Sequence, residues 1–362
     1  MFSRAESVKS RTNNYMKKSC FCFLLGAALN AALVCTAADA LFPVVVGGRW
    51  GFINNSGTVV INPQFDRVQV FAEGLAPART GRWGFVDTSG KIVINPQFDE
   101  ADIFSEGLAP VKLGGGPGPG VPYYDPRPYD PFHIGGGGGG GGRYGYVDSS
   151  GKYVINPQFD NAKEFSEGLA AVKMGHWGFV DKTGKVVINP QFDEAGSFSG
   201  GLAVIKLGGQ FGFTDTKGSM AINPQFERAQ AFSEGLAAVR SGGKWGFVNK
   251  SGNLEINPQF EDAGSFAKGL APVRQGKHWG FIDPSGKFTI NAQFDGAAPF
   301  SEGVAAVKQS GHWGYSDPTG KLVINPQFDE AQSFTNGLAW VKTGGRFGYV
   351  DSSGKYVWNP TN

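Results

Sequence analysis

Six tryptophans in this sequence are each followed directly by glycine, and they recur along most of the chain. Indole rings exposed at a regular spacing could stack on the sugar rings of a polymer such as a cell-wall glycan. If the rings are buried instead, each contributes about 150–250 Å² of packing and takes no part in recognition. Both alternatives are open at the level of sequence. The candidate ligand-binding residues are Trp50, Trp83, Trp177, Trp245, Trp279 and Trp313.

Other residues that could do chemistry are four histidines and three pairs of adjacent carboxylates. Three histidines precede a Trp-Gly or equivalent pair, where other repeats carry Arg, Lys or Gln, so we expect exposed side chains rather than metal ligands. The members of each carboxylate pair are neighbours in sequence, whereas glycoside hydrolysis needs two carboxyl groups across a cleft. No Gly-x-Ser-x-Gly motif is present, and the glycine run lacks the lysine of a phosphate-binding loop. The sequence therefore predicts a protein that is not an enzyme and binds no cofactor or metal. These residues are His133, His176, His278 and His312, and the pairs Asp99-Glu100, Asp193-Glu194 and Asp329-Glu330.

The elements that must position these side chains form one repeat, represented here by residues 165–198. Short runs at 170–173, 176–181 and 185–188 have the composition of strands. Between the last two runs, the pattern Asp-x-Ser/Thr-Gly-Lys predicts a hairpin with its glycine in the left-handed conformation. We expect the aspartate of this turn, such as Asp181, to accept hydrogen bonds from backbone amides rather than to act in catalysis.

Three further signals lie within the same repeat. The dipeptide Asn189-Pro190 predicts the end of strand pairing, because proline lacks an amide donor and restricts the residue before it. A glycine inside a strand marks a close approach, and we expect a side chain from the adjacent repeat to lie against Gly178. Residues 192–198 fit either a helical turn or a hairpin arm, and we predict a short strand.

The aromatic-glycine pair recurs in nine repeats, and three of them carry Tyr or Phe instead of Trp. With the strings at 244–248, 256–260 and 269–271, the chain resembles the WG-repeat (KWG-repeat) family of bacterial proteins over residues 41–360. The resemblance implies a β-rich repeat fold in a bacterial protein, and it implies no reaction. Glutamate precedes glycine in five repeats and is replaced in three, which argues against an invariant chemical role. The departures are Tyr144, Phe211 and Phe347 for tryptophan, and Gly200, Lys268 and Asn336 for glutamate.

Repeats of this size cannot bury a core alone, so each must complete the core of its neighbour. We therefore predict an all-β tandem array of nine β-meander repeats of about 34 residues. The chain after residue 40 starts at 41–46 and finishes after 356–360, so no strand is left over to complete the first repeat from the last. This favours an open, twisted β-solenoid-like stack, and a closed β-propeller-like ring is the alternative.

Residues 1–40 are predicted to be a cleavable secretory signal peptide, with a basic start, an apolar run at 20–37 and the cleavage site Ala38-Asp39-Ala40. A membrane anchor, or a lipid anchor on Cys35, is the alternative. All three cysteines lie in this segment, so the mature chain is expected to have no disulfide. The segment holds five of the 33 Lys and Arg and two of the 31 Asp and Glu, which leaves a formal charge of −1 on the rest. That balance suggests neither a nucleic-acid partner nor membrane binding after signal cleavage.

The rest of the chain divides into repeats 1–2 at 41–112, a Gly/Pro-rich flexible insertion at 113–142, and repeats 3–9 at 143–362. The insertion is either a tolerated surface loop or, through its Tyr- and Pro-rich centre, an extended ligand for another domain. We expect an exported scaffold, periplasmic or extracellular, that binds protein partners in the bacterial envelope. The alternative is a carbohydrate- or peptidoglycan-binding module that uses a ladder of the repeat aromatics.

Overall fold

The computed structural model describes residues 40–115 and 141–361. The chain divides into two units, Met1–Ala38 and Asp39–Asn362, and all described residues belong to the second. The predicted signal peptide and nearly all of the Gly/Pro-rich insertion lie outside the described residues, so both assignments stay predictions. Every regular element of the described part is a β-strand. Within that part, no helix is long and apolar enough to cross a membrane.

The strands form nine small antiparallel sheets, here called blades 1–9 in chain order. Blade 1 has three strands and each other blade has four. The short strands nearest the centre of the ring are β4 (Arg67–Val68), β8 (Glu100–Ala101), β12 (Asn161–Ala162), β16 (Glu194–Ser199), β20 (Arg228–Ala229), β24 (Asp262–Ala263), β28 (Gly296–Ala297) and β32 (Glu330–Ala331). The longer β16 confirms the short strand predicted within residues 192–198.

Two strands precede the outer strand of each blade, here called its middle strands, although in blade 1 the first of them is the innermost strand. The second of them carries the aromatic-glycine pair. The first set is β1 (Phe42–Val46), β5 (Leu75–Thr80), β9 (Ala109–Leu113), β13 (Leu169–Met174), β17 (Leu202–Leu207), β21 (Leu236–Ser241), β25 (Ala271–Gln275), β29 (Ala305–Gln309) and β33 (Leu338–Thr343). The second set is β2 (Arg49–Ile53), β6 (Arg82–Asp87), β10 (Arg143–Val147), β14 (His176–Asp181), β18 (Gln210–Asp215), β22 (Lys244–Asn249), β26 (His278–Ile282), β30 (His312–Ser316) and β34 (Arg346–Asp351).

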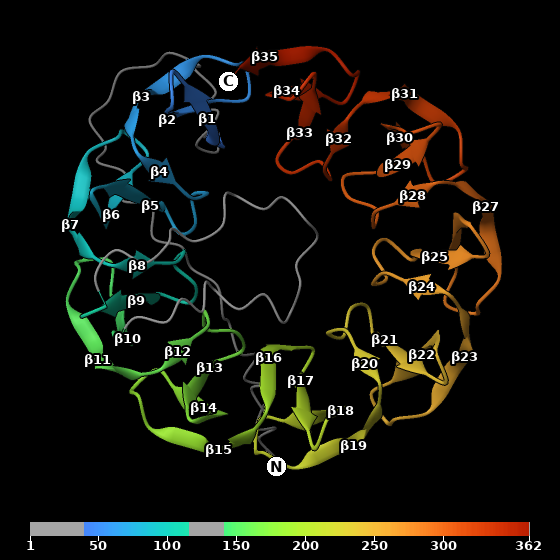
Figure 1. Ribbon diagram of the computed structural model, residues 1–362, viewed down its shortest axis with the longest axis horizontal. Coiled ribbons are helices and arrows are strands. Elements are labelled where there is room, and N and C mark those ends of the chain that lie inside the picture. The colour runs from blue at the N-terminus through green and yellow to red at the C-terminus, as the bar shows by residue number, and fades with distance from the viewer. Residues whose placement is uncertain (1–39, 116–140, 362) are drawn as a thin grey trace, which may run out of the picture. The chain divides into compact units, whose positions relative to one another are not determined.

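The last strand of each blade lies on the outer rim of the ring (Figure 1). These outer strands are β3 (Val59–Phe65), β7 (Ile92–Phe98), β11 (Tyr153–Phe159), β15 (Val186–Phe192), β19 (Met220–Phe226), β23 (Leu254–Phe260), β27 (Phe288–Phe294), β31 (Leu322–Phe328) and β35 (Tyr356–Thr361). Because the inner strand of a blade comes from the sequence repeat before it, blades and sequence repeats are offset by one strand.

The nine blades follow one another around a closed ring, so the fold is a nine-bladed β-propeller (Figure 1). The prediction of an all-β tandem array is confirmed, whereas the open, twisted β-solenoid-like stack is wrong and the closed-ring alternative holds. Nine blades exceed the four to eight that are typical of propellers.

Blade 9 closes the ring on blade 1 through side-chain packing rather than through a shared strand. At the other joints, an aromatic side chain of one blade packs on a phenylalanine of the next, as Phe85 does on Phe104 with 4.9 Å between ring centroids. At the closing joint, Tyr349 instead packs on Phe42 at 5.4 Å. The chain ends were expected to leave the array open, but closure needs no leftover strand. The core of this joint contains Phe42, Val44, Ile53, Leu338, Trp340 and Tyr349.

The glycine after each repeat aromatic is required by the backbone of the outer strand in the same blade. Trp177 pairs with Phe192 and Phe179 with Ile188, so three residues of β15 lie opposite Gly178 in a bulge. A Cβ on Gly178 would lie 2.5 Å from the Ile188 oxygen. The predicted close approach is confirmed, but the neighbour is this backbone and not a side chain of the adjacent repeat.

The Asn-Pro dipeptide was expected to end strand pairing, and this is wrong. Asn189-Pro190 lies inside β15, within the bulge that covers Gly178. Proline is tolerated there because the bulge lies on the outermost strand, where its missing amide leaves no ladder partner unpaired.

The Asp-x-Ser/Thr-Gly-Lys turns are confirmed as hairpins. Between β6 and β7, Oδ1 of Asp87 accepts hydrogen bonds from the Ser89 hydroxyl at 2.6 Å and from the Lys91 amide at 3.0 Å. The Ser89 hydroxyl and these backbone amides lower the pKa of Asp87. Gly90 has a φ of 85°, and a Cβ there would lie 3.0 Å from Cγ2 of Ile61 in the preceding blade. The glycine therefore serves both the turn and the joint between blades.

Candidate functional site

Each of the six candidate tryptophans lies on the strand next to the outer strand of its blade. Trp83, Trp177 and Trp245 are buried, with exposed fractions of 2%, 4% and 8%. Trp50, Trp279 and Trp313 are half-buried. A ring that stacks on a sugar must present a free face, so burial favours the packing alternative for the first three. The glycan-binding role stays a prediction, with the half-buried tryptophans as its better candidates.

In blades 2–9, each repeat aromatic lies beside a basic residue of the neighbouring strand. Lys206 pairs with Phe211 in the ladder, and its Nζ lies 5.1 Å from the centroid of that ring. The aliphatic stems of these cations can cover the aromatic rings while their charges approach solvent. The basic series is Arg79, Lys112, Lys173, Lys206, Arg240, Arg274, Lys308 and Lys342.

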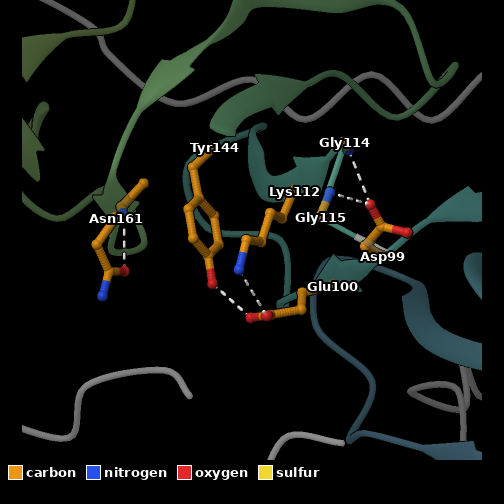
Figure 2. Close-up of polar contacts among 8 residues, drawn as sticks. Asp99, Glu100, Lys112, Gly114, Gly115, Tyr144 and Asn161 are labelled. Carbon is orange, nitrogen blue, oxygen red and sulfur yellow. Dashed lines mark hydrogen bonds and ion pairs between the residues drawn. The ribbon is translucent and has the colours of Figure 1, made fainter. Parts of the chain in front are cut away.

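The most buried cation of this series is Lys112 in blade 3 (Figure 2). Nζ of Lys112 donates to Oε1 of Glu100 at 3.1 Å, and the Tyr144 hydroxyl donates to the other oxygen of that carboxylate. The Lys112 and Glu100 side chains are 7% and 12% exposed. Burial and the hydrogen bond to Glu100 raise the pKa of Tyr144 well above its usual range, so the phenol stays protonated. The cluster is an ion pair and a phenol hydrogen bond held inside the blade.

In most blades, a carboxylate that follows an outer strand accepts an amide from the connection between the two middle strands of the next blade. Asp99 accepts hydrogen bonds from the amides of Gly114 and Gly115 at 2.8 and 3.0 Å (Figure 2). Asp160 accepts the amide of Gly175 in the same way, at 2.8 Å. The predicted pair Asp99-Glu100 is therefore divided between two structural contacts, one with a hairpin and one with a lysine.

Three of the four histidines are exposed, as expected from their repeat position, and His133 lies outside the described residues. His278 Nδ1 lies 3.7 Å from Oδ1 of Asp295. Within residues 40–115 and 141–361, no group of three or more His, Cys, Asp or Glu side chains could hold a metal ion. The exposed histidines are His176, His278 and His312.

The Ser-Glu-Gly segments connect neighbouring blades, a role that was not predicted from the sequence. The carboxylate of Glu167 in blade 4 accepts the amides of Gly200 and Gly201 in blade 5, at 2.6 and 2.8 Å. The hydroxyl of Ser166 donates to the Phe198 carbonyl of blade 5 at 2.7 Å. The signal was visible as a polar triplet that recurs with the repeat, but its partners lie one repeat away and no local spacing points to them.

A hollow of about 500 Å³ runs along the loops that follow the inner strands of blades 3–8. The residue before the loop phenylalanine is Ser, Ala or Pro in repeats 4–7 and Glu164 in repeat 3, whereas Val70 and Ile103 occupy this position in the first two repeats. We call this hollow the serine groove. Its polar side chains are Ser105, Glu164, Ser166, Ser197, Ser199, Ser233 and Ser265.

A second surface feature lies on the outer rim. Strands β3, β7, β11 and β15 follow one another there (Figure 1), and each exposes aliphatic side chains near its start. Val60 and Val93, for example, are 43% and 42% exposed. A run of exposed aliphatic side chains over four neighbouring blades is typical of a contact surface. We call it the outer-rim patch, and it consists of Val59, Val60, Ile92, Val93, Val154, Val186 and Val187.

These features define a nine-bladed β-propeller whose repeated polar side chains mainly hold hairpins and blade joints. A family model described as the WG containing repeat matches residues 50–81, 83–116, 144–175, 177–210, 211–245, 245–277, 279–311 and 313–347. The chain therefore belongs to the WG-repeat family, and the resemblance stated from sequence is confirmed.

Comparison with solved structures shows the fold alone. A crystal structure of the eukaryotic initiation factor aligns with a TM-score of 0.59 at 12% identity, over 88% of this chain and 95% of that chain. Hsv2p from Kluyveromyces lactis aligns with a TM-score of 0.38 at 10% identity, over 53% of this chain and 74% of that chain, which is too distant to support an argument. Among curated proteins, none matches this sequence.

Proposed function

We propose that this protein is an exported, non-catalytic scaffold that binds a protein partner along its outer rim. The observation that carries the proposal is the outer-rim patch, because its side chains are apolar, exposed and spread over four consecutive blades. Burying them against a partner would stabilise the complex by about 25 cal/mol for each Å² of apolar surface removed from water. The Asn-Pro bulge interrupts the free edge of each of the four outer strands that form the patch, so contact through side chains is favoured over addition of a strand.

The positions of the carboxylates support the non-catalytic part of the proposal. Asp87 accepts amides inside its own turn, Asp99 holds a hairpin, and Glu167 connects two blades. General acid–base catalysis needs a carboxyl group that faces the reacting atoms of a substrate. Each of these groups instead recurs with the fold and satisfies backbone donors.

Site-specific photo-crosslinking in the native cell tests whether the outer-rim patch contacts a protein partner. A benzophenone amino acid at Val93 or Val187 is expected to give a discrete adduct with one partner. Thr289 on β27 stands at the same repeat position as Val93, is exposed and is polar, so it is the matched control. Adducts of equal yield at all three positions, or none at Val93 and Val187, would contradict the proposal.

The exported location is tested separately. Protein purified from the envelope or culture medium is expected to begin at Leu41 when its N-terminus is sequenced. Full-length protein that starts at Met1 and stays in the cytosol would overturn export while leaving the rim experiment interpretable.

A further inference from the structure

The serine groove lies where repeats 4–7 carry a small residue at a position that Val70 and Ile103 occupy in the first two repeats. Repeat 8, outside the groove, also carries a small residue there, Ser333. The side chains before the loop phenylalanine are Ser197, Ala231, Ser265 and Pro299 in repeats 4–7. Ile103 in the second repeat shows that the fold accepts a branched aliphatic side chain at this position. The hollow is therefore a local feature of one arc of the ring and is not required by the repeat.

The hydroxyls of the groove present hydrogen-bond acceptors to it. Those of Ser105, Ser166 and Ser199 donate to phenylalanine carbonyls of the following blade, each at 2.7 Å. The Ser265 hydroxyl donates to Oε1 of Gln230 at 3.0 Å. A hydroxyl has one proton and two lone pairs, so a hydroxyl that has given its proton to a carbonyl can only accept from a further ligand.

Two groups in the groove have no partner among the described residues. Oγ of Ser197 makes no hydrogen bond although that residue is only 8% exposed. Glu164 is the one charged residue of the lining, it is half-buried, and it forms no ion pair within the described part of the chain. A half-buried carboxylate without a cation is a favourable site for a charged hydrogen-bond donor.

We infer that the serine groove binds a small ligand that carries a primary ammonium group together with further O–H or N–H donors. The ammonium lies at Glu164, and the other donors face the acceptor lone pairs of Ser105, Ser166 and Ser199. The ligand is either an amino sugar or a lysine side chain of an extended peptide, because both have this chemistry. The site is separate from the outer-rim patch and does not depend on the proposed scaffold role.

Isothermal titration calorimetry of the mature chain with four probes tests the inference. Glucosamine and Nα-acetyl-lysine amide carry the ammonium, while N-acetylglucosamine and Nα-acetyl-norleucine amide are their neutral counterparts. Saturable binding of at least one cationic probe, with its neutral counterpart weaker by about tenfold, is expected from one charge-assisted hydrogen bond. Which cationic probe binds identifies the source of the ligand. Equal binding of a cationic probe and its neutral counterpart, or no binding of either cationic probe, would overturn the inference.

Three variants assign the binding to the groove. Glu164→Gln is expected to weaken the cationic probe by about tenfold and to leave neutral probes unchanged. Ala231→Ile fills the hollow with the side chain that the second repeat already carries, and it is expected to abolish binding. Ser333→Ile places the same side chain at the same repeat position outside the groove and should bind as the wild type does. Unchanged binding by both Glu164→Gln and Ala231→Ile would place the ligand elsewhere and refute the site.

Discussion

The hydroxyl of Tyr349 in the last blade donates a hydrogen bond of 2.9 Å to the backbone carbonyl of Pro43 in the first blade. In blade 2 the equivalent carbonyl, that of Pro77, accepts the amide of Gln69 in the inner segment of its own blade, at 3.0 Å. Blade 1 has no inner strand among the described residues, so the tyrosine hydroxyl takes the place of that amide. One side chain thus satisfies an otherwise incomplete blade and joins the two ends of the ring.

Replacement of this hydroxyl should weaken the closing joint. We expect Tyr349→Phe to lower the free energy of unfolding by about 1 kcal/mol or more, because a buried carbonyl loses its donor. Urea unfolding followed by circular dichroism measures the change. Tyr315→Phe is the matched control, since its hydroxyl donates to the Gln332 carbonyl at the joint between blades 8 and 9. An unchanged unfolding midpoint for Tyr349→Phe would mean that the closing hydrogen bond contributes nothing.

The glycine of the Trp-Gly pair should not tolerate a methyl group. Gly178→Ala places a Cβ 2.5 Å from the Ile188 oxygen and 2.7 Å from the Pro190 nitrogen, so the outer strand must move. Overpacking of this kind costs about 1–3 kcal/mol, measured as a lower midpoint of urea unfolding. Gly141→Ala is the control, because a Cβ there meets nothing within 4 Å. Wild-type stability of Gly178→Ala would show that the bulge adapts freely.

If the repeat tryptophans serve packing, the size of the side chain should affect stability more than the presence of an indole ring. Trp177→Phe should cost less than about 1.5 kcal/mol of unfolding free energy, since it keeps most of the packing. Phe211 and Phe347 stand at the same position in other repeats. Trp177→Ala should cost about 3–5 kcal/mol, because it leaves a cavity in a core where Trp177 is 4% exposed. Similar losses for the two variants would contradict a packing role.

The blade-connecting glutamates combine a favourable contact with an unfavourable backbone conformation. Glu167 has a φ of 55°, in the left-handed region that costs a non-glycine residue about 1–2 kcal/mol. Glu167→Ala keeps the conformational cost and loses both amide contacts, so a loss of about 1–3 kcal/mol in unfolding free energy is expected. Glu167→Gly removes the cost as well, as Gly200 does naturally at a φ of 64°, and should be less destabilising than alanine. The reverse order in thermal unfolding would refute this account.

Acid should destabilise the ring through its turns. The pKa of Asp87, Asp148 and Asp181 is lowered, first by the hydroxyl of Ser89, Ser150 and Thr183 and further by backbone amides. Lys244 likewise lowers the pKa of Glu261 to about 2. A carboxyl whose pKa is lower in the folded state stabilises the fold above its unfolded pKa. That stabilisation is lost as the pH falls from the usual aspartate pKa of 3.8 through the lower pKa of the folded state.

Asparagine in the turns provides the test of that pH dependence. Asn249 already accepts the equivalent amides in its repeat, at 2.9 and 3.1 Å, without a titrating group. A variant with Asp87→Asn, Asp148→Asn and Asp181→Asn should retain the fold and lose less stability between pH 5 and pH 3 than the wild type. Urea midpoints at both pH values measure this. Equal acid sensitivity would exclude these turns as its source.

The sequence by itself determined the strands, the hairpins and the family. These depend on contacts between near neighbours: Asp181 and Thr183 are two residues apart, and their hydrogen bonds form in any chain that makes the turn. The strand glycine was recognised as a place of close approach for the same reason. The prediction that a side chain of the adjacent repeat lies there was wrong. The neighbour is a bulge in the paired strand, and the bulge depends on the register of the two strands, which one repeat in isolation does not define.

Only the tertiary structure decided between an open stack and a ring. The angle between blades is set by packing across joints, such as that of Phe85 on Phe104. Nine such angles either add up to a full turn, which closes the ring, or leave the stack open. The hydrogen bond that closes the ring joins residues separated by 306 positions, and no local sequence pattern predicts it. The serine groove has the same origin. Its side chains are scattered from Ser105 to Ser265 along the chain, and they line one hollow because the ring curves their loops towards one another.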